Sequence, residues 1–229
     1  MKLLSKIRRK DLSKEVVLVR VDFNLEHPEG ALRLKAVLPT VKFLLARNAR
    51  VALLSHRGRP EGPDVQLTLE PAGRAFAKLL GAPVHFLASR DFAVLKRRLE
   101  SMPPQSVCLL ENLRFYAEEE ENDARFADNL ARLGTLYVND AFAVSHRANA
   151  SVAAITRFLP AYAGLRLQEE VEALSRVMRK PARPLVIVIG GAKIADKLGV
   201  IRHFWDKTDY FLLGGGPGNT VLKAKGVDI

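Results

Sequence analysis

The sequence predicts an α/β protein: a parallel sheet with helices on both faces, in a Rossmann-like three-layer arrangement, followed by an incomplete second α/β domain. Short apolar runs rich in β-branched residues alternate with segments whose apolar residues recur every three or four positions. This alternation is typical of parallel strands joined by right-handed helical crossovers. The length of 229 residues, at roughly 150 residues per domain, fits one full domain and part of another.

Seven apolar runs are the predicted strands, because each is too short for a typical helix; they cover residues 16–21, 51–54, 84–87, 107–110, 136–138, 185–189 and 210–213. Between them, apolar residues at helical spacing predict helices around residues 38–45, 69–80 and 126–133. Asn122 and Asp123 are typical N-cap residues for the last of these helices. The acidic run over residues 118–121 is predicted to be a solvated loop or helix start.

A long amphipathic helix is predicted over residues 163–178, and it marks the domain boundary. Two prolines in the segment over residues 180–184 disfavour its continuation, and a new strand follows. We therefore expect a first domain over residues 1–165, an interdomain helix and linker over residues 166–181, and a partial second domain over residues 182–229. The second domain has two predicted strands, which make a poor sheet on their own.

The composition restricts the compartment and the kind of site. Cys108 is the single cysteine, so the sequence excludes an internal disulfide, and its apolar neighbours predict a buried thiol. No stretch approaches the ~20 apolar residues of a membrane span, and the basic N-terminus lacks the apolar region of a secretory signal. A cytoplasmic protein without a membrane partner is therefore expected. His27, His85 and His203 have no ligand-like spacing, and we assign no protein-bound metal to them.

The net charge indicates an anionic partner. The chain has 36 Lys and Arg against 25 Asp and Glu, a formal charge of +11. Nucleic acid, a phosphorylated metabolite or a membrane surface would each fit that total. The nucleic-acid interpretation rests on charge alone, because the sequence has no recognised binding motif and only 7% aromatic residues.

Polar side chains follow four of the predicted strands at the point where each strand ends. Parallel strands end at one edge of a sheet, and open α/β sheets bind ligands outside that edge. Arginine presents a planar pair of donors that suits carboxylate or phosphate. We therefore expect a small polyanion to bind where the following residues converge: Asp22, Asn24, His56, Arg59, Arg114 and Arg147.

Two glycine segments follow the last two predicted strands. Gly190-Gly191-Ala192-Lys193 follows one, with Asp196-Lys197 shortly after, and Gly214-Gly215-Gly216 follows the other. Glycine turns that lead into helices present backbone N–H groups to phosphate, and lysines add positive charge. The pattern differs from a P-loop, and an ordinary tight turn remains an alternative for the first segment. The second domain is therefore predicted to bind a nucleotide.

Seven segments in this order resemble the motifs of the phosphoglycerate kinase family across nearly the whole chain. The first is Val19-Arg20-Val21-Asp22-Phe23-Asn24, and the second, Ser55-His56-Arg57-Gly58-Arg59-Pro60, is similar to the family's S-H-x-G-R-P. The others cover residues 110–115 (L-E-N-L-R-F), 137–142 (Y-V-N-D-A-F), 146–151, 190–197 and 214–220.

The resemblance implies a two-domain, hinge-bending enzyme of glycolysis and gluconeogenesis. It would transfer a phosphoryl group between 1,3-bisphosphoglycerate and ADP, or from ATP to 3-phosphoglycerate, with Mg²⁺. The substrate carboxylate would attack phosphorus directly, so catalysis would consist of positioning and charge neutralisation. Arg33, Lys193 and Lys197 are the implied catalytic residues. The implied phosphoglycerate ligands are Asp22, Asn24, Arg33, His56, Arg59, Arg114 and Arg147; the implied nucleotide contacts are Gly190, Gly191, Lys197, Gly214, Gly215 and Gly216.

Several departures from the family pattern leave alternatives open. Residues 29–32 are predicted to form an unusually short loop before Arg33, and Asn149 replaces the second histidine of the family's H-R-A-H-A-S. The chain ends inside the implied nucleotide domain, before the family's G-G-D motif, so no protein ligand for Mg²⁺ is expected in it. A non-catalytic fragment or paralogue that binds phosphoglycerate or another anion is therefore the second hypothesis. The family implies a monomer, but exposed strands in the second domain are expected to self-associate, to fray, or to pair with a missing C-terminal half.

Overall fold

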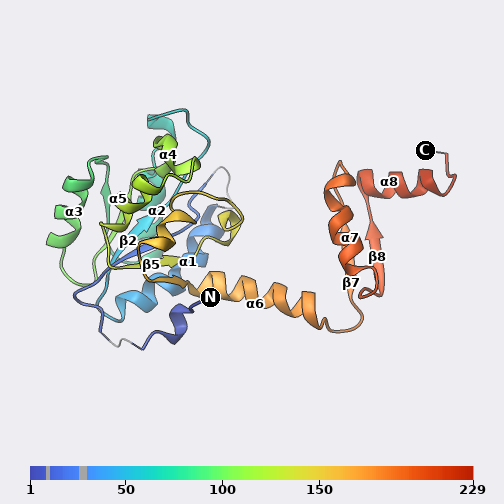
Figure 1. Cartoon of the computed structure of the whole chain (residues 1–229), viewed down its shortest axis with the longest axis horizontal. Coiled ribbons are helices and arrows are strands. Elements are labelled where there is room, and N and C mark those ends of the chain that lie inside the picture. The colour runs from blue at the N-terminus through green and yellow to red at the C-terminus, as the bar shows by residue number, and fades with distance from the viewer. Residues whose placement is uncertain (9–10, 26–29, 229) are drawn as a thin grey trace. The chain divides into compact units, whose positions relative to one another are not determined.

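The computed structural model describes residues 1–8, 11–25 and 30–228, so His27 and Glu29 lie outside the described residues. These residues form two compact units, Met1–Glu170 and Val171–Ile229 (Figure 1). The boundary between the units falls within helix α6, Leu165–Arg179. No helix in the described ranges is long and apolar enough to cross a membrane.

The first unit is built on a parallel sheet. Its described strands number six and run in the order β3-β4-β2-β1-β5-β6. Every pairing is parallel, and the central strand β1 lies between β2 and β5, with Val17 opposite Val51 and Leu136. The strands are β1 (Val16–Arg20), β2 (Arg50–Leu54), β3 (Val84–Leu87), β4 (Val107–Leu110), β5 (Leu136–Asn139) and β6 (Ala161–Ala163).

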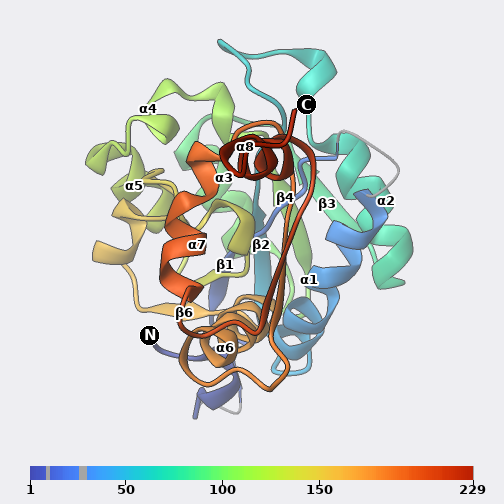
Figure 2. The same cartoon turned by 90° about the vertical axis from the view of Figure 1, so that its right-hand side faces the viewer.

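Helices cover both faces of this sheet, which confirms the predicted three-layer arrangement (Figure 2). Because successive side chains of a strand point to opposite faces, Val17 and Val19 of β1 enter one apolar cluster and Leu18 enters the other. Helices α1 and α2 pack on the first cluster, and α3 and α5 pack on the second. Their bounds are α1 (Gly30–Leu45), α2 (Glu70–Leu80), α3 (Phe92–Ser101), α4 (Ala117–Glu120) and α5 (Ala124–Ala131).

Local sequence explains where several of these elements begin and lie. Asp123 caps α5 by accepting a hydrogen bond from the Phe126 backbone N–H at 2.7 Å, as predicted. The Cys108 side chain is fully buried in β4, also as predicted, and burial raises the pKa of its thiol to about 12. Each predicted strand is present within one residue of its predicted bounds.

The structure also corrects several predictions. Strand β6 was not predicted, because three residues are too few to show a periodicity, and α6 consequently begins at Leu165 rather than at residue 163. Residues 30–32 of the predicted loop belong to α1, so Arg33 lies in the first turn of a helix, and Glu29 lies outside the described residues. The acidic run begins a helix, but Glu119 in α4 is fully buried rather than solvated.

The second unit contains a two-stranded sheet among its described residues, with helices beside it. The parallel strands are β7 (Val186–Ile189) and β8 (Tyr210–Leu213), and the helices are α7 (Leu198–Phe204) and α8 (Gly215–Ala224). Val188 is 75% exposed and Leu212 is 54% exposed, so much of this sheet remains uncovered. This incomplete second α/β region is the one the sequence predicted.

Candidate anion site at the edge of the first sheet

The carboxyl ends of four strands in the first unit carry the predicted anion-binding residues. Asp22 and Asn24 follow β1, His56 follows β2, Arg114 lies in the 3₁₀ turn after β4, and Arg147 follows the turn after β5. Their mutual influence shows that several of them lie close together. Arg59 and Arg147 both lower the pKa of the Arg114 guanidinium, and Arg33, Arg114 and Arg147 all oppose protonation of His56.

His56 is an uncharged member of this cationic group. Burial, followed by the charges of Arg20, Arg114, Arg147 and Arg33, lowers the pKa of His56 from 6.5 to about 2. Only 4% of the residue is exposed. The imidazole is therefore neutral at physiological pH and can act as one hydrogen-bond donor and one acceptor.

A buried polar network lies beneath His56. The Arg20 guanidinium lies 3.2 Å from His56 Nδ1, donates from Nε to Ser151 Oγ at 2.8 Å, and lies 3.8 Å from Glu119 Oε1. Glu119 also accepts from the Ser151 N–H and hydroxyl. Burial raises the pKa of the Glu119 carboxyl, although Arg20 and these hydrogen bonds oppose that shift.

Sequence reasoning did not assign a role to Arg20, Glu119 or Ser151. One signal was available: Arg20 is the single charged residue in the apolar run over residues 16–21. A charge in a buried strand needs a partner. The partners themselves lie 131 residues away in the case of Ser151, and no local pattern identifies them.

Arg114 is held rigidly at the same edge. Its residue is 7% exposed, Nη1 donates to the Gly58 carbonyl at 2.5 Å, and Nε lies 3.1 Å from Glu120 Oε1. Burial and the nearby arginines lower the pKa of the guanidinium, and Glu120 raises it. Arg59, by contrast, is exposed, and Arg147 is partly buried. This edge of the sheet thus combines one buried, hydrogen-bonded arginine with two more accessible arginines.

Buried polar side chains connect the loops that carry these groups. Asn112 is fully buried and uses both ends of its amide: Oδ1 accepts from the Arg57 and Arg114 N–H groups, and Nδ2 donates to the Arg57 and Leu67 carbonyls. Asn24 Oδ1 accepts from the Gly58 N–H at 2.9 Å. The segment after β2 is therefore attached to the segments after β1 and β4.

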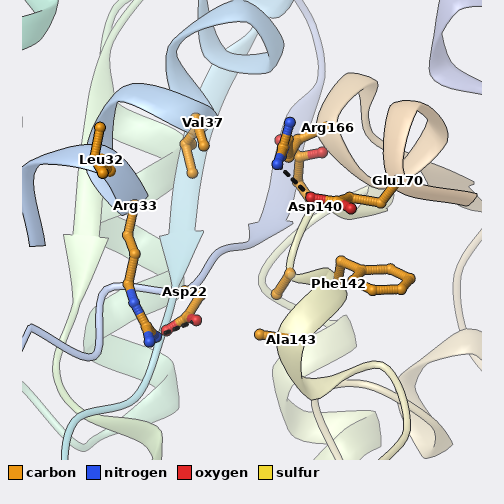
Figure 3. Close-up of a pocket in the computed structure, with 11 residues that line it drawn as sticks. Asp22, Leu32, Arg33, Val37, Asp140, Phe142, Ala143, Arg166 and Glu170 are labelled. Atoms are coloured by element: carbon orange, nitrogen blue, oxygen red, sulfur yellow. Dashed lines mark hydrogen bonds and ion pairs between the residues drawn. The ribbon is translucent and has the colours of Figure 1, made fainter. Parts of the chain in front are cut away.

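Asp22 and Arg33 form a separate part of the edge. Their side chains make an ion pair at 2.5 Å, and they line a cavity of about 330 Å³ (Figure 3). The far wall includes Asp140, Phe142 and Arg166, which is paired with Glu169 and Glu170. None of Asn24, His56, Arg59, Arg114 and Arg147 lines this cavity in the described structure. The predicted ligands thus include an Asp22–Arg33 pair that lines this cavity and a cationic group around His56, on which the Arg33 charge also acts.

In the second unit the two glycine segments lie against each other. The Gly216 N–H donates to the Gly191 carbonyl at 2.9 Å, and a Cβ on Gly216 would lie 2.2 Å from the Ala192 carbonyl oxygen. Gly191 and Gly215 have φ angles of 119° and 59°, which favour glycine. Lys193 is exposed and Lys197 is partly buried at the end of a 3₁₀ turn. This close backbone approach leaves no room for a side chain at Gly216.

The described residues contain no group of three or more His, Cys, Asp or Glu side chains that could hold a metal ion. A Mg²⁺ ion held by protein side chains alone would need such a group, whereas a Mg²⁺ ion held mainly by nucleotide phosphates needs only one or two carboxylates. His27, which was assigned no metal, lies outside the described residues.

The family model and the relatives that match this chain carry the same description. The family model described as phosphoglycerate kinase matches residues 7–229. The phosphoglycerate kinase of Dictyoglomus turgidum is 44% identical over 227 residues, and that of Moorella thermoacetica is 45% identical over 230 residues. Each match covers 97% of this chain but only 57% and 58% of those proteins.

Two solved structures are also similar. Phosphoglycerate kinase from Coxiella burnetii has a TM-score of 0.84 at 36% identity, with 99% of this chain and 57% of that chain covered. Phosphoglycerate kinase from Pyrococcus horikoshii OT3 has a TM-score of 0.87 at 31% identity, with 100% of this chain and 58% of that chain covered. The chain thus spans less than two thirds of the relatives it matches.

Proposed function

The chain belongs to the phosphoglycerate kinase family, and from that premise we propose that its first unit binds phosphoglycerate and its second unit supplies part of a nucleotide site. The reaction would be phosphoryl transfer between 1,3-bisphosphoglycerate and ADP, a step of glycolysis and gluconeogenesis. One observation supports this assignment above the others: the charges of Arg147 and Arg59 act on the Arg114 guanidinium, and those of Arg114 and Arg147 act on the neutral His56. A small anion with a carboxylate and a phosphate suits such a group.

The proposed ligands of 3-phosphoglycerate are the residues of this edge. Arg59, Arg114 and Arg147 would neutralise its charge, and His56 would donate one hydrogen bond. Asp22 and Asn24 would orient the ligand and the arginines, and Arg33 would leave Asp22 to reach the transferring group.

The nucleotide side of the proposal rests on the two adjacent glycine segments. Backbone N–H groups at Gly190, Gly191 and Gly215 would face the phosphates, with Lys193 and Lys197 as cations. Gly214 and Gly216 would line the site by their lack of side chains, because their own N–H groups donate to the Ile189 and Gly191 carbonyls. Mg²⁺ would arrive with ATP or ADP and neutralise phosphate charge. The proposed functional division is a first domain over residues 1–165, an interdomain helix and linker over residues 166–181, and a partial second domain over residues 182–229. The proposed location is cytoplasmic, which cell fractionation tests.

The proposed chemistry needs no protein nucleophile. The carboxylate oxygen of 3-phosphoglycerate attacks the terminal phosphorus of ATP while the bond to the leaving ADP oxygen breaks, and the reverse reaction regenerates ATP. The chain's residues contribute by aligning the two oxygens and by neutralising charge on the equatorial oxygens. Arg33, Lys193 and Lys197 are the proposed catalytic residues for this purpose.

Calorimetric titration of the full chain with 3-phosphoglycerate tests the binding assignment. Arg59→Ala should weaken binding by about 10- to 100-fold, because a charge-assisted hydrogen bond contributes roughly 1.5–3 kcal/mol. Arg59 is exposed, so the fold should tolerate its loss. Arg97→Ala on α3 removes the same charge from another exposed position and serves as the control. Absence of binding at low salt, or equal affinities of both variants, would contradict the assignment.

A non-catalytic anion-binding protein is the second candidate, because the chain spans only 57% of its relatives' length. A coupled assay of ATP consumption with 3-phosphoglycerate separates the two candidates. Turnover at roughly 1–100 per second, the usual range of kinases, supports the enzyme. Saturable 3-phosphoglycerate binding without turnover supports the second candidate.

A further inference from the structure

We propose that Arg20 is a positioning residue that fixes the tautomer of His56, so that Nδ1 accepts from the protein and Nε2 carries the proton. The Arg20 Nη2 atom lies 3.2 Å from His56 Nδ1, and both residues are buried. A guanidinium has five donors and no acceptor. The Nδ1 atom must therefore present its lone pair to Arg20, which leaves the single proton of a neutral imidazole on Nε2.

The guanidinium is held from several sides and has little freedom to release His56. Nε donates to Ser151 Oγ, and Nη1 donates to the Val21 carbonyl at 2.7 Å. Glu119 lies beside Nη2 and is itself fixed by two hydrogen bonds from Ser151. A lysine at position 20 would keep the charge, but its single ammonium could not reproduce this planar set of contacts.

The charged groups around His56 oppose a second proton on the ring. Arg20 faces it from β1, Arg33 from α1, Arg114 from the turn after β4, and Arg147 from the segment after β5. The acidic group nearest to Arg20 in the described structure is Glu119, which Arg20 and Ser151 already occupy. The ring therefore stays neutral, with a defined donor and a defined acceptor.

His56 Nε2 donates to no protein acceptor among the residues that the structure describes. The ring nitrogen opposite Arg20 is thus left to donate to a ligand oxygen. Resting on the proposed function, we assign that oxygen to bound phosphoglycerate. Arg20 would then act on the ligand through the orientation of His56 and not by touching it.

Nitrogen-15 NMR of the labelled full chain tests the tautomer without any ligand. The sequence has five histidines, and His56→Gln identifies the signals of His56 by their loss. Between pH 7 and pH 5, His56 should show the long-range couplings of a neutral ring protonated at Nε2. An Nδ1-protonated or doubly protonated ring at pH 6 would overturn the proposal. This measurement on the unsubstituted chain decides the matter even where Arg20 variants fail to fold.

Arg20→Lys and Arg20→Gln then separate positioning from charge. In folded variants the His56 spectrum should change to a mixture of tautomers, and 3-phosphoglycerate binding to Arg20→Lys should weaken about tenfold despite the retained charge. Full rescue of affinity and tautomer by lysine would overturn the positioning role. Arg50→Lys is the control, because Arg50 is a partly buried arginine of the neighbouring strand β2 that donates to the carbonyls of residues 13 and 102 and does not contact His56.

The two proposals fail differently. An Nε2-protonated His56 in a chain that does not bind 3-phosphoglycerate refutes the proposed function but supports the role of Arg20. Normal binding of 3-phosphoglycerate by a chain whose His56 is protonated at Nδ1 supports the proposed function but refutes the role of Arg20.

Discussion

Replacing Asn112 by aspartate exchanges two hydrogen-bond donors for an acceptor at a fully buried position. Asn112 Nδ2 donates to the Arg57 carbonyl at 2.8 Å and to the Leu67 carbonyl at 3.0 Å. Asn112→Asp has nearly the same shape, so it leaves both carbonyls facing a carboxylate oxygen. An unsatisfied buried group costs roughly 1–3 kcal/mol, so two such groups should lower the free energy of unfolding by about 2–6 kcal/mol.

Urea unfolding followed by far-UV circular dichroism measures this loss. Asn112 lies in the first unit, and the single tryptophan, Trp205, lies in the second, so tryptophan fluorescence gives an internal reference that should not shift. Asn129→Asp on α5 makes the same chemical change at an exposed position and should alter stability by no more than about 0.5 kcal/mol. Equal stabilities of the two variants would refute the argument that the Asn112 amide joins the loops.

Three further outcomes are expected. Gly134→Ala should lower the free energy of unfolding by about 1–3 kcal/mol in urea, because a Cβ there would lie 2.6 Å from Leu18 Cγ, whereas Gly62→Ala, with nothing within 4 Å, should be neutral. His56, with its pKa lowered from 6.5 to about 2, binds a proton below pH 6.5 only in the unfolded chain. His56 should therefore lower the free energy of unfolding by about 2 kcal/mol as the pH falls from 7 to 5. The check is the difference in free energy of unfolding between the unsubstituted chain and His56→Gln at each pH, and a difference that does not change with pH would contradict the shift. Val188 is 75% exposed on β7, so sedimentation velocity should show concentration-dependent association that Val188→Lys reduces; a monomer at all concentrations would contradict this.

Much of the fold could be predicted because its signals are local. A run such as residues 107–110 is apolar and short, and it forms β4 with those bounds. Asp123 identifies the start of α5 through a cap that spans three residues. Strand β6 escaped prediction because three residues between a proline and a helix carry no periodicity, and its pairing with β5 comes from elsewhere in the chain.

In the candidate site, too, local signals could be predicted and contacts between distant residues could not. His56 and Arg114 were identifiable because polar residues at strand ends of a parallel sheet converge. Glu119 was expected in solvent because an acidic run is usually exposed, and the hydrogen bonds that compensate its burial come from Ser151, 32 residues away.

The amino-acid sequence alone determines the order of strands and helices, the family, and which cations lie at the carboxyl ends of the strands, since each of these depends on neighbouring residues or on a motif. Only the tertiary structure decides that Arg20 is buried against Ser151 and His56, and that Asp22 and Arg33 pair on a separate cavity. The physical reason is that a buried charge is stable only with its partners in place, and those partners are brought together by packing across more than a hundred residues of chain.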